Sequence, residues 1–180
     1  RGVRIAALDE ALCEGGGDEA EHRQVADRLV ELVNAQTELF HDLSDSCYAT
    51  FMNSGHRECW KLESSGFRNW LSYKYFLETR GAPSDTALKA ALGTLLGQAK
   101  YEGPEKPVFR RVAKDEEALW IDLCDEDWKA IKVLPGSWEV VNNPPVMFMR
   151  SPTMSTLPVP AEKGDIELLW SLLNISKEER

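Results

Sequence analysis

Five short segments rich in β-branched and aromatic residues follow one another between residues 106 and 150, and they constrain the fold more than any other feature of the chain. Each is bounded by residues that favour turns, which is the pattern of an antiparallel meander. Apolar side chains recur at every second position, as at Ile131 and Val133, so one face of the sheet is expected to be buried. The segments are residues 107–113, 118–124, 128–134, 138–141 and 146–150.

Two of the connections between these segments have clear turn chemistry. Residues 135–137 read Pro-Gly-Ser, in which proline presets φ and Gly136 accepts a positive φ. Residues 125–127 read Asp-Glu-Asp, and aspartate hydrogen-bonds its own backbone in turns. Both stretches therefore predict hairpin connections.

The first half of the chain predicts helices and one hairpin. Apolar residues at spacings of three and four favour a helix over residues 19–40, with Asp18 suited to its start. Residues 47–53 and 57–62 are typical of two strands joined by a compact turn at residues 53–55. These strands form the expected N-terminal hairpin.

Two further helices are expected to begin after Ser64 and Ser84, whose hydroxyls suit an N-cap. Residues 81–83 read Gly-Ala-Pro and separate the two helices. Beyond Arg150, three prolines favour an extended strap that lies across its own domain. Asp165 then suits the start of a last short helix.

Together these patterns predict an α+β fold. The helices and the N-terminal hairpin are expected to pack on an antiparallel β-meander of four to five strands, with the last helix closing one edge. A length of 180 residues allows one such domain with small appendages. The expected organisation is a flexible leader over residues 1–18, which contains three consecutive glycines, an α+β domain over 19–150, a proline-rich strap over 151–164, and a closing helix and tail over 165–180.

The sequence has no recognisable catalytic motif. A Walker A motif, a GxGxxG fingerprint and a Gly-x-Ser-x-Gly elbow are absent, and the four cysteines and three histidines are too dispersed for a zinc site. Acids gather at residues 115–117 and among residues 122–127, where turn solvation explains them more simply than a divalent cation. We expect no catalytic residue, no metal and no cofactor; an enzyme site assembled from the acidic turns stays as a weaker alternative.

The charge distribution points to one region for contact with nucleic acid. The net charge of −9 argues against a protein coated with nucleic acid, but residues 47–113 hold ten Lys and Arg against six Asp and Glu, a net of +4. Cations there alternate with aromatic residues, and such rings stack on unpaired bases while cations contact phosphates. Core packing is the simpler explanation for Trp60, Phe67 and Trp70. The predicted nucleic-acid-binding residues are His56, Arg57, Lys61, Arg68, Lys74 and Arg80.

Several stretches of the chain also carry a family resemblance. Residues 118–132 read ALWIDLCDEDWKAIK, residues 136–141 read GSWEVV, residues 144–150 read PPVMFMR, residues 55–58 read GHRE and residues 64–71 read SSGFRNWL. They resemble the region that precedes the P-loop ATPase module in primase-helicase-like proteins of phages, plasmids and integrated elements. The resemblance covers residues 47–174 and does not include the catalytic motifs of that family.

The resemblance implies a non-catalytic accessory domain in DNA replication, which contacts single-stranded or forked DNA and couples to a C-terminal P-loop ATPase module of the same protein. The alternative is a protein-interaction or oligomerisation module, such as a homo-oligomer, that does not bind nucleic acid and uses its acidic first helix or its last helix. No apolar run is long enough to cross a bilayer and the first residues lack a signal-peptide core, so we expect a cytoplasmic protein with no membrane partner.

Overall fold

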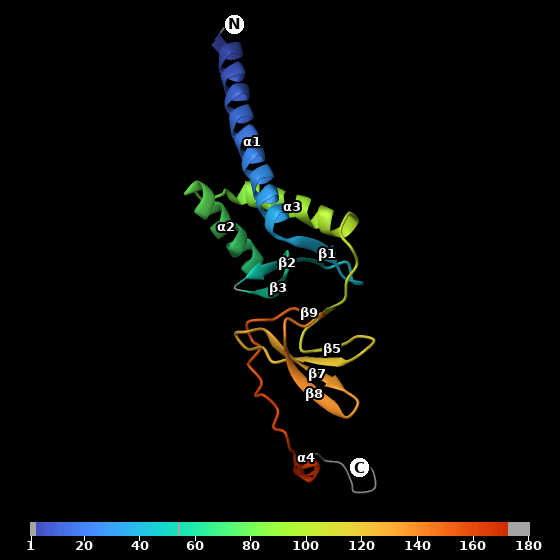
Figure 1. Ribbon diagram of the computed structural model, residues 1–180. Helices are drawn as coiled ribbons and strands as arrows, with labels where there is room; N and C mark the ends of the chain where they lie inside the picture. The colour runs from blue at the N-terminus through green and yellow to red at the C-terminus, as the bar shows by residue number, and fades with distance from the viewer. Residues whose placement is uncertain (1–2, 54, 173–180) are drawn as a thin grey trace.

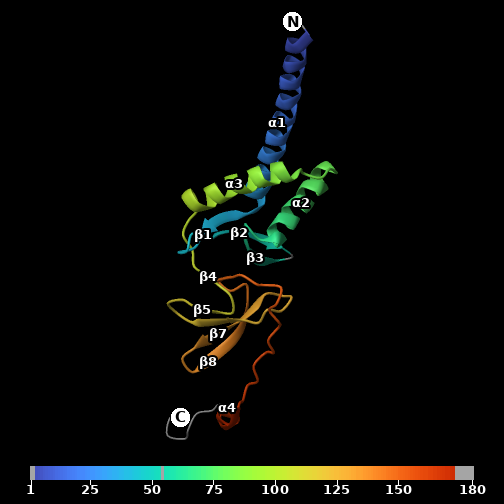
Figure 2. The same cartoon turned by 180° about the vertical axis from the view of Figure 1, so that it is seen from behind.

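The computed structural model describes residues 3–53 and 55–172 and has a mixed α+β fold. Figure 1 shows an elongated molecule, with a helical lobe (α1–α3 and β1–β3), a meander lobe (β5–β8) and a short helix, α4, beyond it. The view from behind in Figure 2 shows the same order along the long axis. Strands β4 and β9 lie at the junction between the two lobes.

The helical lobe contains three helices and a three-stranded antiparallel sheet with strand order β1-β2-β3. The hairpin expected over residues 47–62 is confirmed, with Asn53 paired opposite His56; the expected turn residue Ser54 lies outside the described residues. The elements of this lobe are α1 (Val3–Gln36), β1 (Glu38–His41), β2 (Cys47–Asn53), β3 (His56–Lys61), α2 (Ser65–Thr79) and α3 (Asp85–Tyr101).

Helix α1 begins and ends earlier than the sequence predicts. It starts at Val3, so a helix occupies most of the stretch where a flexible leader was expected over residues 1–18. Glycine in a helix interior costs roughly 1 kcal/mol relative to alanine, which disfavours a helix at residues 15–17 without forbidding it. At the other end, Leu39 and Phe40 lie in β1 and not in the helix, because pairing with β2 replaces helical hydrogen bonds there.

The expected N-caps of α2 and α3 are confirmed. The Ser64 hydroxyl accepts a hydrogen bond from the backbone N–H of Phe67 at 3.1 Å, and the Ser84 hydroxyl accepts one from Ala87 at 3.2 Å. Each hydroxyl satisfies a backbone donor that has no partner within its helix. The apolar faces of the helices then meet β2 in one core. Its fully buried side chains include Leu29, Val33, Leu62, Phe67, Leu71 and Leu95.

The meander lobe contains the expected antiparallel meander, with strand order β5-β6-β7-β8. Leu134 pairs opposite Ser137, and Gly136 has a φ of +80° in the turn between them, as its turn chemistry predicts. The remaining strands are β4 (Val108–Phe109), β5 (Val112–Lys114), β6 (Leu119–Asp122), β7 (Lys129–Leu134), β8 (Ser137–Asn142) and β9 (Met147–Phe148).

Strands β4 and β9 form a separate parallel pair at the junction. The segment over residues 146–150, expected as a meander strand, therefore joins the two lobes instead. Met147 is buried in a cluster with Phe40, Tyr48 and Cys59 of the helical lobe, whereas the neighbouring Phe148 belongs to the core of the meander lobe. Alternation along this short strand thus places one side chain in each core.

The three long helices pack on strands β1–β3 and not on the meander. Among the described residues, the buried cluster of the meander lobe consists of strand and turn residues, such as Trp120, Ala130 and Phe148. The expected packing of helices on the meander is therefore replaced by two lobes with separate cores. The reason is β1: a third strand makes the N-terminal sheet large enough to cover the helices by itself.

The strap over residues 151–164 has no regular secondary structure, and its first part lies on the meander lobe as expected. The backbone N–H of Leu157 donates to the Leu123 carbonyl at 2.8 Å. The Arg111 guanidinium donates to the Ser155 carbonyl at 2.9 Å. These two contacts attach the strap to the end of β6 and to the residues before β5.

Helix α4 (Ile166–Leu172) follows the strap but does not close an edge of the sheet. Figures 1 and 2 place it beyond the end of the meander lobe. The extended, proline-rich chain carries it away from the sheet, and Leu168 and Leu172 are 67% and 83% exposed. The tail expected over residues 173–180 lies outside the described residues.

A buried tyrosine supports the connection between β1 and β2. The Tyr48 hydroxyl donates to the Asp42 carboxylate at 2.9 Å. Burial, followed by this hydrogen bond, raises the pKa of Tyr48 to about 12. Burial also acts to raise the pKa of Asp42, but the Ser46 N–H and the Tyr48 hydroxyl outweigh it and hold that pKa below its ordinary value.

We expect the stability contributed by Tyr48 to be lost as the pH rises from about 10 to about 12, because the unfolded chain releases the phenolic proton first. Tyr48→Phe should make this alkaline loss shallower and lower the free energy of unfolding at pH 7 by about 1 kcal/mol, the contribution of one hydrogen bond. Urea denaturation at pH 7 and at pH 11 measures the free energy of unfolding and its alkaline loss. Tyr73→Phe, on an exposed tyrosine, is the control. An alkaline loss as steep in Tyr48→Phe as in the unaltered protein would contradict this assignment.

Candidate nucleic-acid interface

The six residues predicted to bind nucleic acid do not share one surface. Arg57 donates to the Pro144 carbonyl at 3.2 Å, which ties β3 to the loop before β9. Arg68 donates to Asp85 at 2.8 Å, which links α2 to the start of α3. His56 lies inside the junction. These three side chains are therefore engaged by the protein itself.

Glu58 is a buried acid in the middle of β3, and it organises the residues around it. Its carboxylate accepts hydrogen bonds from the Asn53 amide at 2.6 Å and from the Trp60 indole N–H at 2.7 Å. The His56 imidazole Nε2 lies 3.2 Å from the same carboxylate. A buried carboxylate requires such partners, and in return the His56 and Trp60 rings are fixed in orientation.

Trp128 and Arg150 join the meander lobe to this network. The Trp128 indole stacks on the His56 ring, with 5.4 Å between centroids and 15° between planes. The Arg150 guanidinium lies 3.9 Å from the Trp128 ring centroid and meets both carboxylate oxygens of Asp122, at 2.6 and 3.0 Å. Because Asp122 is almost fully buried, this is a desolvated, bidentate ion pair. The stacked rings and the pair together connect β3 to the meander.

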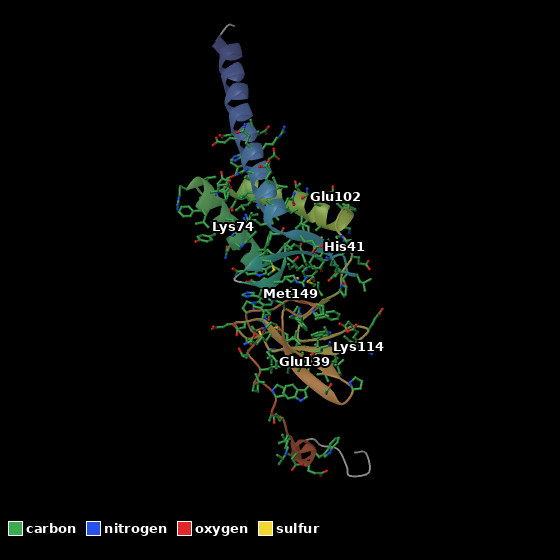
Figure 3. All side chains as sticks on the ribbon, viewed as in Figure 1. His41, Lys74, Glu102, Lys114, Glu139 and Met149 are labelled. Carbon is green, nitrogen blue, oxygen red and sulfur yellow. The ribbon has the colours of Figure 1, made fainter. Side chains whose placement is uncertain are left out.

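A groove of about 380 Å³ opens beside this network, between the two lobes. We name it the junction groove. Figure 3 shows its lining residue Met149 at the boundary between the lobes. Lys61, the fourth predicted cation, lines the groove; its ammonium contacts the Ser46 hydroxyl at 3.3 Å and the exposed Glu63 carboxylate at 3.5 Å. The lining residues are Glu58, Cys59, Trp60, Lys61, Ser64, Ser65, Gly66, Trp128, Met149, Arg150, Ser151 and Pro152.

The last two predicted cations lie on the exposed side of α2. The Lys74 ammonium lies 5.6 Å from the Trp70 ring centroid, and the Arg80 guanidinium lies 5.8 Å from the Phe76 ring centroid. Neither cation has an acidic partner among the described residues. We name this surface the α2 face; it consists of Tyr73, Lys74, Phe76, Leu77 and Arg80.

The α2 face adjoins a second hollow, of about 450 Å³, whose lining includes three aromatic side chains. Phe51 and Trp70 stack there with 4.8 Å between ring centroids, and Trp70 also stacks on the buried Phe67 at 5.4 Å. The expectation that Phe67, Trp60 and Trp70 belong to the core is confirmed, since Phe67 is fully buried and both indoles pack against its cluster. The hollow is lined by Gln36, Phe51, Met52, Asn53, Trp70, Tyr73 and Lys74.

The acidic turns use their carboxylates to hold the chain. Asp115 accepts hydrogen bonds from the backbone N–H groups of Glu117 and Ala118 and from the Trp120 indole N–H. The Ala118 N–H, and then the Trp120 indole, hold the pKa of Asp115 below its ordinary value. Within residues 3–53 and 55–172, no group of three or more His, Cys, Asp or Glu side chains is arranged to hold a metal ion.

Two thiols of the helical lobe, Cys47 and Cys59, are not activated. Burial raises the pKa of Cys59 to about 12, and burial, with the nearby Glu63 charge, also raises the pKa of Cys47. The thiolate is the nucleophilic form of cysteine, so a raised pKa suppresses it at neutral pH. Neither Cys47 nor Cys59 therefore has the environment of a nucleophile.

Comparison with known proteins found no matching family model, no curated protein with a similar sequence and no solved structure with a similar fold. Function must therefore be inferred from the chain itself. Within the described residues, the helices do not combine the length and apolar character needed to cross a membrane.

Sequence reasoning missed the contribution of Trp128 and Arg150 to the candidate site. The two residues lie in different predicted strands, 22 positions apart in the printed sequence, and their partners Asp122 and His56 are distant in sequence, with His56 in the other lobe. One signal was available: Trp128 and Arg150 stand at the first and the last position of their predicted strands, and Asp122 lies within the predicted strand over residues 118–124.

Proposed function

We propose that this chain is a non-catalytic accessory domain of a mobile-element primase-helicase-like protein. In this proposal it contacts single-stranded or forked DNA in the cytoplasm and couples that contact to a P-loop ATPase module of the same protein. The observation that supports it best is the α2 face, where two cations have ring partners and no acidic partner among the described residues. The family resemblance supports the link to an ATPase.

The chemistry of the α2 face favours unpaired DNA over duplex DNA. Lys74 and Arg80 are available for phosphate contacts, and Tyr73 and Phe76 are 58% and 44% exposed. Exposed rings stack on bases only where those bases are unpaired. The acidic parts of the chain limit the contact to this region, because a long duplex would also approach negative surfaces.

We expect Lys74→Glu combined with Arg80→Glu to weaken binding to a labelled single-stranded oligonucleotide and to make it less sensitive to salt. Each phosphate contact adds about 0.7 to the slope of log affinity against log salt for single strands, so losing two contacts should lower the slope by about 1.4. Fluorescence anisotropy at several salt concentrations measures affinity and slope together.

The matched control for each single substitution, Lys74→Glu or Arg80→Glu, is Lys114→Glu. Figure 3 shows Lys114 on the meander lobe, far from Lys74 on α2, and its side chain is exposed. This control changes the net charge without touching the α2 face, so its salt slope should equal that of the unaltered protein. Equal losses in Lys114→Glu and in either single α2-face variant would mean that only net charge matters, and would contradict a site on α2.

A protein-interaction or oligomerisation module is the second candidate function. The observation that favours it is α4, whose exposed Leu168 and Leu172 lie on a helix beyond the meander lobe. The two proposals differ in the same experiment. Absence of binding to any DNA at low salt, together with a light-scattering mass above that of one chain, would favour the interaction module.

A further inference from the structure

The junction groove is bounded by an indole from each lobe. Trp60 comes from β3 of the helical lobe, and Trp128 comes from the turn before β7 in the meander lobe. Met149 and Cys59 add further apolar surface. A lining that combines two indoles with these apolar side chains is of the concave, mostly apolar kind that holds small flat ligands.

Both rings are fixed before any ligand arrives. The Trp60 indole N–H is hydrogen-bonded to Glu58 at 2.7 Å, and the ring lies so close to Gly66 that a Cβ there would stand 2.5 Å from it. Trp128 is held by the His56 ring and by the Arg150 guanidinium. A binding surface that is already ordered loses less entropy on binding than a mobile one.

The polar groups at the rim of the groove favour an anion. The Lys61 ammonium is partly exposed, and its contacts to Ser46 and Glu63 are long enough to be exchanged for a phosphate. Ser64, Ser65 and Gly66 begin the 15-residue helix α2, whose N-terminus carries a partial positive charge. The acid in the lining, Glu58, is already engaged with Asn53, His56 and Trp60.

We infer that the junction groove receives one unpaired base of a DNA strand, with the adjoining phosphate at Lys61 and the first turn of α2. This inference rests on the proposed function and adds a second contact to the one on the α2 face. Side chains from two lobes line the groove, so binding there depends on the relative position of the lobes. Charge alone does not distinguish the two contacts, but Trp60→Leu does, because it changes the groove and leaves Tyr73 and Phe76 of the α2 face in place.

The test compares an oligothymidylate with an abasic strand of the same length, which has the same phosphates and no bases. Anisotropy with the full chain should give about tenfold weaker binding for the abasic strand, the effect of losing one stacked base. Trp60→Leu should weaken binding to the thymidylate strand by about the same factor and leave the abasic strand unaffected. Trp138→Leu, on the exposed edge strand β8, should change neither.

A measurement on the unaltered protein makes the test independent of variants. An oligothymidylate with one 5-iododeoxyuridine should crosslink under ultraviolet light to peptides that contain Trp60 or Trp128, as mapped by mass spectrometry. Unchanged binding of the thymidylate strand by Trp60→Leu, or crosslinks confined to Tyr73 and Phe76, would overturn the groove assignment and leave the proposed function standing. Absence of binding to either strand at low salt would overturn both.

Discussion

Arg150→Met is expected to lower the free energy of unfolding by about 3–5 kcal/mol, because it removes one partner of a buried ion pair and leaves the other without its cation. Asp122 is 1% exposed, and Arg150 meets both of its carboxylate oxygens. Methionine keeps most of the apolar stem of the side chain but not the guanidinium, so the contact of that group with the Trp128 ring is lost together with the ion pair. Urea denaturation at pH 7 measures the loss.

The control for this prediction is Arg68→Met, which breaks the ion pair between α2 and α3. That pair is exposed, with Asp85 83% accessible, so its loss should cost less than about 1 kcal/mol. Both variants remove one arginine and change the net charge equally. A difference between their losses in the free energy of unfolding therefore reports the burial of the ion pair. Equal, small losses in the two variants would show that the Asp122–Arg150 pair does not support the junction.

Phe67→Ala is expected to cost about 3–5 kcal/mol, because it leaves a cavity in the core of the helical lobe. The Phe67 side chain is fully buried in the first turn of α2, where it stacks on Trp70. The capping bond from its backbone N–H to Ser64 does not involve the side chain and is retained. Thermal and urea denaturation should both report the change.

Phe76→Ala on the same helix is the matched control. It makes the same chemical change, but Phe76 is 44% exposed, so we expect a loss within about 0.5 kcal/mol. Because Phe76 also belongs to the α2 face, this variant doubles as a probe of DNA binding with the fold intact. A loss as large as that of Phe67→Ala would place the core of the lobe elsewhere.

The parts of the fold that local sequence determines were predicted correctly. Ser64 and Ser84 cap their helices because a hydroxyl directly before an apolar helical repeat can accept a hydrogen bond from a backbone N–H of the first turn. The turn at Gly136 and the strands on either side follow from φ preferences and two-residue alternation. These signals act within a few residues, so they are readable without knowledge of the tertiary structure.

The parts that depend on contacts between distant residues were not predictable in the same way. Leu39 and Phe40 continue the apolar spacing of α1, and only pairing with β2 makes them a strand. Met147 has the sequence signature of a meander strand, but its neighbours in space, Phe40 and Tyr48, lie about a hundred residues away in the printed sequence. The division of the predicted basic surface has the same cause, because Arg57 and His56 find partners in the other lobe.

The parallel pairing of β4 and β9 determines how the lobes are tethered. The chain passes from the helical lobe to the meander lobe once, between α3 and β4, and the segment before β9 comes back to the boundary, where the Asn143 amide donates to the Gly55 carbonyl. One covalent connection therefore crosses the boundary, and the β4–β9 pair and this hydrogen bond hold a second segment beside it. A pull along the molecule, from α4 towards α1, would be shared by the connection and these contacts, and it would act on the contacts as shear. The lobes should thus transmit force as one stiff rod and not swivel about a hinge.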